Sequence, residues 1–257
     1  MDPRRVAVIT GAASGIGRAT VELFNERGCA VVAVDLRAEA LGWADGLNDV
    51  ATVVGDVSHE TTNAAAVTMA LERWGRLDIA VLNAGTVGSP GFEADGAIER
   101  FDEVIAVNLR SVAVGIRHAV PAIRATGVHG AIVATASTSG LGGDPGNWAY
   151  NASKAGVINL VRAAALDYAA EGIRINAVAP GPTDTGMTQG LARLPDLYRA
   201  MARRVPLQRW GHASELAEAI WFLSSPAASF ITGVTLPVDG GLSASAGHFD
   251  LPHGSPD

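Results

Sequence analysis

The amino-acid sequence predicts an α/β fold, a doubly wound parallel sheet of about seven strands with helices on both faces. Short apolar runs alternate with longer segments of helical period along the 257 residues. Most of these runs are continuously apolar, as in strands that are buried on both faces of a parallel sheet. Strand–helix alternation over the whole length indicates βαβ units with right-handed crossovers.

Seven apolar runs are predicted as strands, and most of the segments between them as helices. The strands are expected at 4–11, 30–36, 51–57, 79–85, 130–137, 173–181 and 234–241. The helices are expected at 15–27, 38–46, 59–74, about 97–124, 150–171 and 213–224. No repeat, low-complexity segment or linker divides the chain, so residues 1–257 are interpreted as a single domain.

Two segments stand outside this alternation. The segment of about 182–212 carries weak helical signals that are broken by Gly and Pro. A long insertion after a strand is more often a functional lid than a loop without function. We interpret this segment as a substrate loop. Residues of about 244–257 are expected to form a surface tail, in which His248 and His253 are solvated, and no metal site is predicted.

Composition and charge exclude several classes of protein. The net charge of −7, without any block of like charge, disfavours nucleic-acid binding. The single cysteine, Cys29, excludes an internal disulfide framework and is expected to be a small buried residue. The N-terminus lacks the apolar core of a signal peptide, and no apolar run is long enough to span a membrane. A cytoplasmic protein without a membrane or nucleic-acid partner is expected.

A glycine-rich turn, TGAASGIG at residues 10–17, lies between the first strand and the first helix. Gly11 can take backbone angles that a side chain would forbid, and the missing Cβ atoms of Gly15 and Gly17 let a pyrophosphate approach. Free N–H groups and the helix dipole bind anions at such an N-terminus. The spacing is G-x-x-x-G-x-G rather than G-x-G-x-x-G. A glycine-rich turn without a ligand is the alternative interpretation.

Asp35 ends the second predicted strand, where an acidic side chain meets the adenosine ribose of a dinucleotide. Its carboxylate would accept hydrogen bonds from the 2′ and 3′ hydroxyls and would repel a 2′-phosphate. Arg18 and Arg37 are close in sequence, and Arg37 is the residue that would favour a phosphate. The sequence therefore favours NAD over NADP.

Lys154 is the only lysine, whereas eighteen positions are arginine. It follows Tyr150 by four residues, so both are expected on one face of a helix. A nearby ammonium lowers the pKa of a phenol from its ordinary value of about 10. Tyr150 is therefore predicted to exchange a proton with an alcohol or ketone, and Lys154 also to reach ribose hydroxyls. A chance pairing is the alternative.

Ser137 ends the fifth predicted strand. Ligands of doubly wound sheets lie at the carboxyl ends of the strands, so its hydroxyl is expected to hold the substrate oxygen against Tyr150. Ser139 and Thr138 are rival hydroxyls, and a serine that merely caps the strand is the alternative.

Together these residues resemble the short-chain dehydrogenase/reductase family over about residues 4–243. The motifs come in the family's order, namely TGAASGIG (10–17), DV (56–57), NAG (83–85), VNL around Asn108, Ser137, Tyr150 with Lys154, PGPTDT (180–185) and ITGVTLPVDGG (231–241). The resemblance implies a Rossmann fold and a catalytic set of Asn108, Ser137, Tyr150 and Lys154. Asn108 would hold a water that links the lysine to solvent.

The resemblance also implies which residues bind a nicotinamide cofactor. They are Gly11, Ser14, Gly15, Ile16, Gly17, Asp35, Asp56, Val57, Asn83, Ala84, Gly85, Tyr150, Lys154, Pro180, Gly181, Thr183 and Thr185. Asp56 and Val57 correspond to the adenine contact. Either Thr183 or Thr185 would bind the nicotinamide amide.

The implied reaction is hydride transfer between a nicotinamide cofactor, NAD being favoured, and a secondary alcohol or ketone. The candidate pocket walls are Leu141, Gly142, Gly143, Trp148, Met187, Leu191, Leu194, Tyr198 and Met201. Because they are mostly apolar, a neutral cyclic or hydrophobic substrate is favoured over a sugar or polyol.

Two other functions remain open, an NADPH-dependent biosynthetic ketone reductase and a non-catalytic regulator that senses a dinucleotide. The family resemblance further implies a homotetramer.

Overall fold

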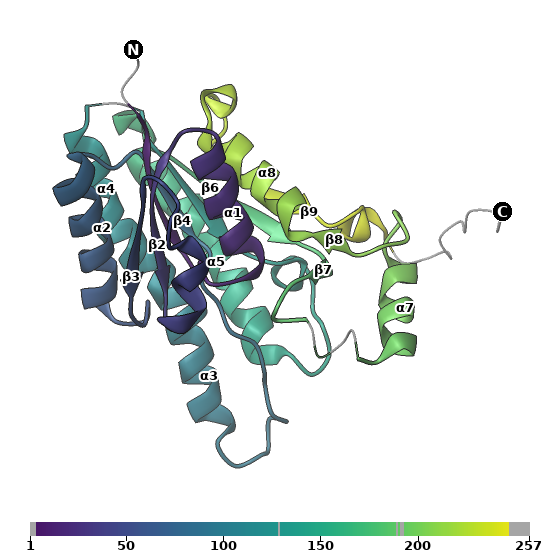
Figure 1. The fold of residues 1–257 in the computed structure, drawn as a ribbon. Coiled ribbons are helices and arrows are strands. Elements are labelled where there is room, and N and C mark those ends of the chain that lie inside the picture. The colour runs from purple at the N-terminus through teal and green to yellow at the C-terminus, as the bar shows by residue number, and fades with distance from the viewer. Residues whose placement is uncertain (1–3, 128, 189, 191–192, 247–257) are drawn as a thin grey trace.

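A parallel sheet forms the centre of the computed structural model, which describes residues 4–127, 129–188, 190 and 193–246 (Figure 1). Its strands are β1 (Val6–Thr10), β2 (Ala30–Asp35), β3 (Val50–Val54), β4 (Ile79–Leu82), β5 (Ala131–Thr135), β6 (Arg174–Pro180) and β9 (Thr235–Val238). They lie in the order β3-β2-β1-β4-β5-β6-β9, and each neighbouring pair is parallel. The predicted doubly wound parallel sheet is confirmed.

Helices cover both faces of this sheet (Figure 1). α1 (Gly15–Glu26) and α8 (Ala213–Ser224) pack on one face, and α2 (Glu60–Trp74), α4 (Ser111–Ala125) and α5 (Trp148–Tyr168) pack on the other. Short 3₁₀ turns lie at Glu39–Ala44, Thr138–Gly140, Ala169–Glu171, Pro226–Ala228 and Leu242–Ala244. The helix predicted at 38–46 is thus a 3₁₀ turn.

The helix predicted at about 97–124 contains a π-helical turn. α3 (Ala97–Ile105) leads into this turn at Ala106–Arg110, and α4 follows directly. A π turn holds one residue more than an α turn and is frequent at functional sites. The turn includes Asn108, which is fully buried.

Residues 182–212 form an excursion from the sheet whose start and end lie side by side. β7 (Thr183–Asp184) follows β6, and β8 (Gly211–His212) pairs with β7 in parallel. Between them α7 (Pro195–Arg204) stands at the side of the molecule (Figure 1). The predicted tail falls largely on residues 247–257, including both of its histidines, and these lie outside the described residues.

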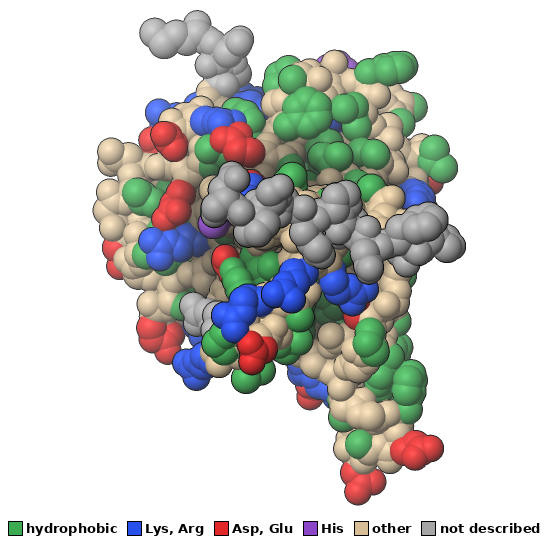
Figure 2. Space-filling view, turned by 90° about the vertical axis from the view of Figure 1, so that its right-hand side faces the viewer, with side chains coloured by type: hydrophobic (Ala, Val, Ile, Leu, Met, Phe, Trp, Pro, Cys, Tyr) green, Lys and Arg blue, Asp and Glu red, His purple; other side chains and the backbone are tan. Residues whose placement is uncertain are grey.

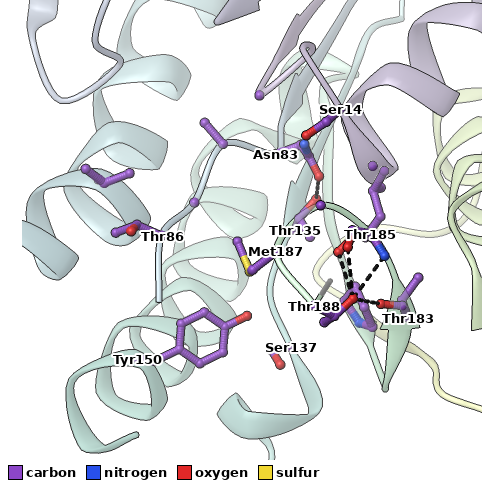
Figure 3. Close-up of a pocket in the computed structure, with 18 of the residues that line it drawn as sticks. Ser14, Asn83, Thr86, Thr135, Ser137, Tyr150, Thr183, Thr185, Met187 and Thr188 are labelled. Atoms are coloured by element: carbon purple, nitrogen blue, oxygen red, sulfur yellow. Dashed lines mark hydrogen bonds between the residues drawn. The ribbon is translucent and has the colours of Figure 1, made fainter. Parts of the chain in front are cut away.

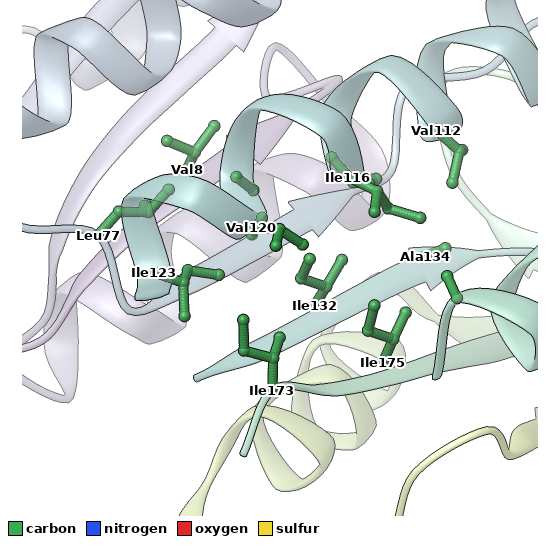
Figure 4. Packing of buried hydrophobic residues seen from close by; sticks show 14 of the residues in the cluster. Val8, Leu77, Val112, Ile116, Val120, Ile123, Ile132, Ala134, Ile173 and Ile175 are labelled. Carbon is green, nitrogen blue, oxygen red and sulfur yellow. The ribbon is translucent and has the colours of Figure 1, made fainter. Parts of the chain in front are cut away.

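Branched aliphatic side chains fill the space between the sheet and the helices. Figure 4 shows this packing between α4, β5 and β6, with Val112, Ile116, Val120, Ile123, Ile132 and Ile175. Strands buried from both sides need no alternation of polar and apolar residues, which explains the continuous apolar runs. Within the described part of the chain, no helix combines the length and apolarity needed to cross a membrane.

Asp78 fixes the amino ends of three neighbouring strands. Its side chain is 2% exposed, and it accepts the Val6 N–H at 2.7 Å and two bonds from the Arg76 guanidinium at 2.9 and 2.6 Å. Its backbone N–H donates to the Val6 carbonyl, and its carbonyl accepts the Ala131 N–H. β1, β4 and β5 therefore begin in a fixed register.

Replacing Asp78 with alanine is expected to lower the free energy of unfolding by about 3 kcal/mol, because a half-buried guanidinium and the buried amide of Val6 lose their partner. Urea unfolding followed by circular dichroism measures the change. Asp196→Ala is the matched control, since its ion pair with Arg199 is exposed, and exposed pairs contribute about 0–1 kcal/mol. Equal effects of the two substitutions would contradict the role assigned to Asp78.

Candidate active site

A cavity of about 750 Å³ opens at the carboxyl ends of the central strands. Parallel strands end at one edge of the sheet, so residues far apart in sequence meet there. The predicted residues that line the cavity are Gly11, Ser14, Gly15, Ile16, Asp35, Asp56, Val57, Asn83, Ala84, Gly85, Ser137, Tyr150, Lys154, Pro180, Gly181, Thr183 and Thr185. Gly17 and Asn108 are not among the lining residues.

The glycine turn opens the N-terminus of α1 toward this cavity. Gly11 and Gly15 have φ angles of +68° and +54°, which favour glycine. A Cβ atom on Gly17 would lie 2.0 Å from the Gly11 carbonyl oxygen, so the turn closes only with glycine there. Ser14, the N-cap residue, makes no side-chain capping bond. The resulting cradle fits the diphosphate of a dinucleotide, which the first-turn N–H groups would bind.

Asp35 stands at the end of β2, beside the glycine turn. Its Oδ2 accepts the Ala13 N–H at 2.9 Å, and its Oδ1 accepts the Arg37 N–H at 3.4 Å. Asp35 and Arg37 both line the cavity. The bond from Ala13 therefore fixes a carboxylate at this end of the cavity, beside the backbone of Arg37.

The NAG segment after β4 is tied to the strands on both sides. Thr10 Oγ1 accepts the N–H groups of Asn83 and Ala84 at 2.9 and 3.0 Å. Thr135 Oγ1 donates to Asn83 Oδ1 at 3.0 Å (Figure 3). Asn83 thus bridges β1 and β5 and holds the segment in place at the cavity wall.

Tyr150 and Ser137 lie close together at one end of the cavity (Figure 3). Burial raises the pKa of the Tyr150 hydroxyl, a hydrogen bond with Ser137 lowers it, and the charge of Asp144 raises it further. The net direction is the opposite of the one expected from the sequence. In the protein alone, removal of the phenol from water outweighs the hydrogen bond with Ser137 that lowers the pKa.

Ser137 is the hydroxyl that reaches the cavity, whereas its two rivals are engaged elsewhere. Ser139 Oγ donates to the Asp144 carboxylate, and Thr138 Oγ1 donates to the Pro180 carbonyl at 3.3 Å. Ser137 Oγ itself accepts the Ser139 N–H at 3.1 Å, which fixes its direction.

Lys154 is buried on the same helix as Tyr150, with 3% of its surface exposed. Its Nζ donates to the Thr135 carbonyl at 2.7 Å and lies 5.6 Å from the centre of the Tyr150 ring. Burial lowers the pKa of Lys154 from 10.5 to about 8. The only lysine of the chain therefore lies in a place that disfavours its charged form.

The Asn108 side chain is hydrogen-bonded to the backbone of Thr86. Its Oδ1 accepts the Thr86 N–H at 2.8 Å, and its Nδ2 donates to the Thr86 carbonyl at 2.9 Å and to Ser153 Oγ at 3.0 Å. The side chain is thus engaged with the segment after Gly85 and with α5, and it does not line the cavity.

Thr188 is a residue that the sequence analysis missed. Its Oγ1 accepts the Thr185 N–H at 3.0 Å and donates to the Thr183 carbonyl at 2.8 Å (Figure 3). These bonds close residues 183–188 into a turn that packs Thr185 against Gly15, where a Cβ atom would meet Thr185 Cβ at 3.0 Å. A hydroxyl three residues after Thr185 is the sequence signal that points to it.

The segment 182–212 provides an apolar wall. Met187, Met201 of α7 and Trp210 line the cavity. Tyr198 stacks on Trp210 with 4.5 Å between ring centroids and donates to the Asp184 carboxylate at 3.2 Å. α7 is thereby anchored to the β7–β8 pair.

The outward side of α7 is charged. It carries Arg199, Arg203 and Arg204, and arginine side chains gather on this face of the molecule (Figure 2). The other predicted walls differ from the structure, because Leu141, Gly142, Gly143, Trp148, Leu194 and Tyr198 are not among the lining residues. Leu191 lies outside the described residues.

Comparison with known proteins agrees with this arrangement. A family model described as enoyl-(acyl carrier protein) reductase matches residues 11–243. The chain belongs to the short-chain dehydrogenase/reductase family. As a member, it is an oxidoreductase whose family implies a nicotinamide cofactor, NAD or NADP.

Similar proteins match over almost the whole chain. Cis-4-hydroxycyclohexanecarboxylate dehydrogenase of Sinomonas cyclohexanicum is 45% identical over 253 residues, which cover 93% of this chain and 97% of the relative. The 2-(R)-hydroxypropyl-CoM dehydrogenase of Xanthobacter autotrophicus is 38% identical over 248 residues, with 93% and 99% covered. The crystal structure of levodione reductase is similar with a TM-score of 0.87 at 35% identity, covering 95% of this chain and 99% of that one.

Lys154→Met is expected to stabilise the cofactor-free protein at pH 7. Burial lowers the pKa of the ammonium from 10.5 to about 8, so the protonated lysine disfavours the folded state below pH 8. Removing it should raise the free energy of unfolding by up to about 3 kcal/mol.

The gain should fade as the pH rises from 8 to 10.5, because the lysine then becomes neutral in the folded and unfolded states alike. Thermal unfolding over this pH range measures the effect. The pH dependence serves as the internal control, since the chain has no second lysine. A variant less stable than the wild type at pH 7 would refute this account.

Proposed function

We propose that this protein is an NAD-dependent dehydrogenase that interconverts a secondary alcohol and its ketone. One observation carries the proposal. A single cavity is lined by the glycine turn and Asp35 and also by Ser137, Tyr150 and Lys154. A dinucleotide with its diphosphate at the N-terminus of α1 would extend from Asp35 toward Tyr150.

The choice of NAD rests on the charge of Asp35, and the placing of the nicotinamide amide rests on the threonines after β6. The Asp35 carboxylate would bind the ribose hydroxyls of NAD and repel the 2′-phosphate of NADP. Thr185 is the better candidate for the nicotinamide amide, because its hydroxyl contacts Thr188 Oγ1 at the long distance of 3.4 Å, whereas the Thr183 hydroxyl donates to the Gly181 carbonyl at 2.9 Å. Asp56, Val57 and the NAG segment would contact the adenosine half.

The chain's own residues would move and hold the proton. When bound, the nicotinamide ring supplies the hydride acceptor or donor. Ser137 Oγ would hold the substrate oxygen, and Tyr150 Oη would take its proton during oxidation and return it during reduction. The Lys154 ammonium would stabilise the phenolate and bind ribose hydroxyls. Asn108 would act through the segment after Gly85.

The apolar wall supports a neutral cyclic or hydrophobic substrate. Met187, Met201 and Trp210 offer no charged group to a ligand. The name of the Sinomonas relative specifies a hydroxylated cyclohexane ring with a carboxylate, which makes a carboxylated ring the second candidate.

An NADPH-dependent ketone reductase and a non-catalytic dinucleotide sensor are the alternative functions. Arg37 at the adenosine end of the cavity is the feature that favours NADPH. A sensor has no need of a proton-transferring tyrosine with a lysine four residues later. The family resemblance supports a homotetramer, and the single cysteine fits a reducing cytoplasm.

Tyr150→Phe should lower kcat by roughly 10²–10⁴-fold, the usual contribution of a positioned acid or base. The measurement is absorbance at 340 nm with NAD⁺ or NADP⁺ and cyclohexanol, cis-4-hydroxycyclohexanecarboxylate or sorbitol. Tyr168→Phe is the matched control, because Tyr168 lies at the far end of α5, outside the cavity lining. Turnover retained by Tyr150→Phe would rule out the proposed proton transfer. A wild type that binds NAD⁺ but oxidises none of these alcohols would favour the sensor.

Asp35→Ala should raise kcat/KM with NADP⁺ about tenfold or more, because a like charge opposite a phosphate costs on the order of 1–2 kcal/mol. The ratio of kcat/KM for the two cofactors measures selectivity. Asp45→Ala, which removes an acid outside the cavity lining, should leave the ratio unchanged. A wild type that already prefers NADP⁺ would show the cofactor assignment to be wrong.

A further inference from the structure

The helix that carries Tyr150 begins without a cap of its own. α5 starts at Trp148, so Tyr150 is its third residue, and the N-cap residue Asn147 makes no side-chain capping bond. The first N–H groups of a helix have no partner within the helix, and a capping oxygen usually serves the second or third of them. The first turn of α5 therefore depends on an acceptor from elsewhere.

Ser89 supplies this acceptor from sixty residues away. The N–H of Ala149, the second residue of α5, donates to Ser89 Oγ at 3.0 Å. The position of the bond is the one that an N-cap serine would serve. The residue next along the helix is Tyr150.

The segment that bears Ser89, residues 86–92, is itself held at its start. Thr86 bonds with Asn108 through both its N–H and its carbonyl. The Arg100 guanidinium donates to Thr86 Oγ1 at 3.1 Å and to the carbonyls of Val87 and Gly88. Ser89 thus extends from a fixed backbone.

A second contact joins segment 86–92 to the first residue of α5. Trp148 Nε1 donates to the Pro90 carbonyl at 2.8 Å. Its ring stacks on Phe92 and on Phe101, with centroid distances of 4.3 and 5.4 Å and interplanar angles of 19° and 12°. The first two residues of α5 are therefore both bound to this segment.

We propose that Ser89 is a positioning residue for Tyr150, which caps the first turn of α5 from outside the helix. The inference rests on the proposed function of Tyr150 as acid and base. Without the cap, the first turn frays, and the Tyr150 hydroxyl spends less time against Ser137. Because segment 86–92 directly follows Gly85 at the cofactor side of the cavity, it also joins the cofactor wall to the helix of the base.

The test compares Ser89→Ala with Ser89→Thr in the full-length protein. Ser89→Ala should lower kcat about three- to tenfold while KM for NAD⁺ changes less than about twofold, since a lost cap costs on the order of 1 kcal/mol. Ser89→Thr keeps the hydroxyl and should restore most of kcat. Ser225→Ala is the matched control, because Ser225 Oγ accepts the N–H of the second residue of the short turn at Pro226–Ala228, and Ser225 does not line the cavity.

Hydrogen–deuterium exchange gives a readout that is independent of turnover. In Ser89→Ala, but not in Ser225→Ala, peptides covering residues 147–153 should exchange roughly fivefold faster. Unchanged exchange there overturns the proposal, and so does an unchanged kcat in a protein whose Tyr150→Phe variant is inactive. If the wild type oxidises no alcohol, the proposed function fails and the exchange measurement alone decides whether Ser89 caps α5.

Discussion

The burial of one ammonium group is the constraint on which the site depends. Lys154 lies in the interior, where its ammonium donates to the Thr135 carbonyl at the end of β5, and burial lowers its pKa to about 8. An uncompensated charge in such a place opposes folding. The rest of the fold must therefore offset this cost. The strands buried on both faces and the hydrogen bonds of Asp78 at the opposite edge of the sheet provide that stability.

The topology of the sheet explains why the cavity lies where it does. The strand order reverses direction between β1 and β4. The chain therefore leaves β1 toward one face of the sheet and β4 toward the other, and a crevice remains between the carboxyl ends of these two strands. The glycine turn follows β1 and the NAG segment follows β4. Thr10 and Asn83 join the two across this crevice, so its width is set by hydrogen bonds between the strands it separates.

Hydrophobic periodicity and turn residues predicted the strands and helices, because these elements depend on residues that are close in sequence. The strands are apolar runs, and the helix expected at 213–224 coincides with α8. The π turn at Asn108 and the Ser89 cap of α5 depend on partners 22 and 60 residues away, which periodicity does not reveal. The sequence predicted a lowered pKa for Tyr150, whereas the structure raises it. The spacing of Tyr150 and Lys154 indicates a neighbouring ammonium but not the loss of water around the phenol.

The pKa shifts of Tyr150 and Lys154 both favour the neutral form of the side chain. The pKa of the Tyr150 phenol is raised, and the pKa of the Lys154 ammonium is lowered. Each shift arises from the same loss of water, and the low dielectric that disfavours a lone charge also strengthens the attraction between opposite charges. A phenolate next to an ammonium is therefore stabilised more in this site than at the surface, once both are formed. In the proposed reaction the cationic ring of bound NAD⁺ would add a second positive charge. Cofactor binding would then favour the ionisation of Tyr150, which burial disfavours in the protein alone.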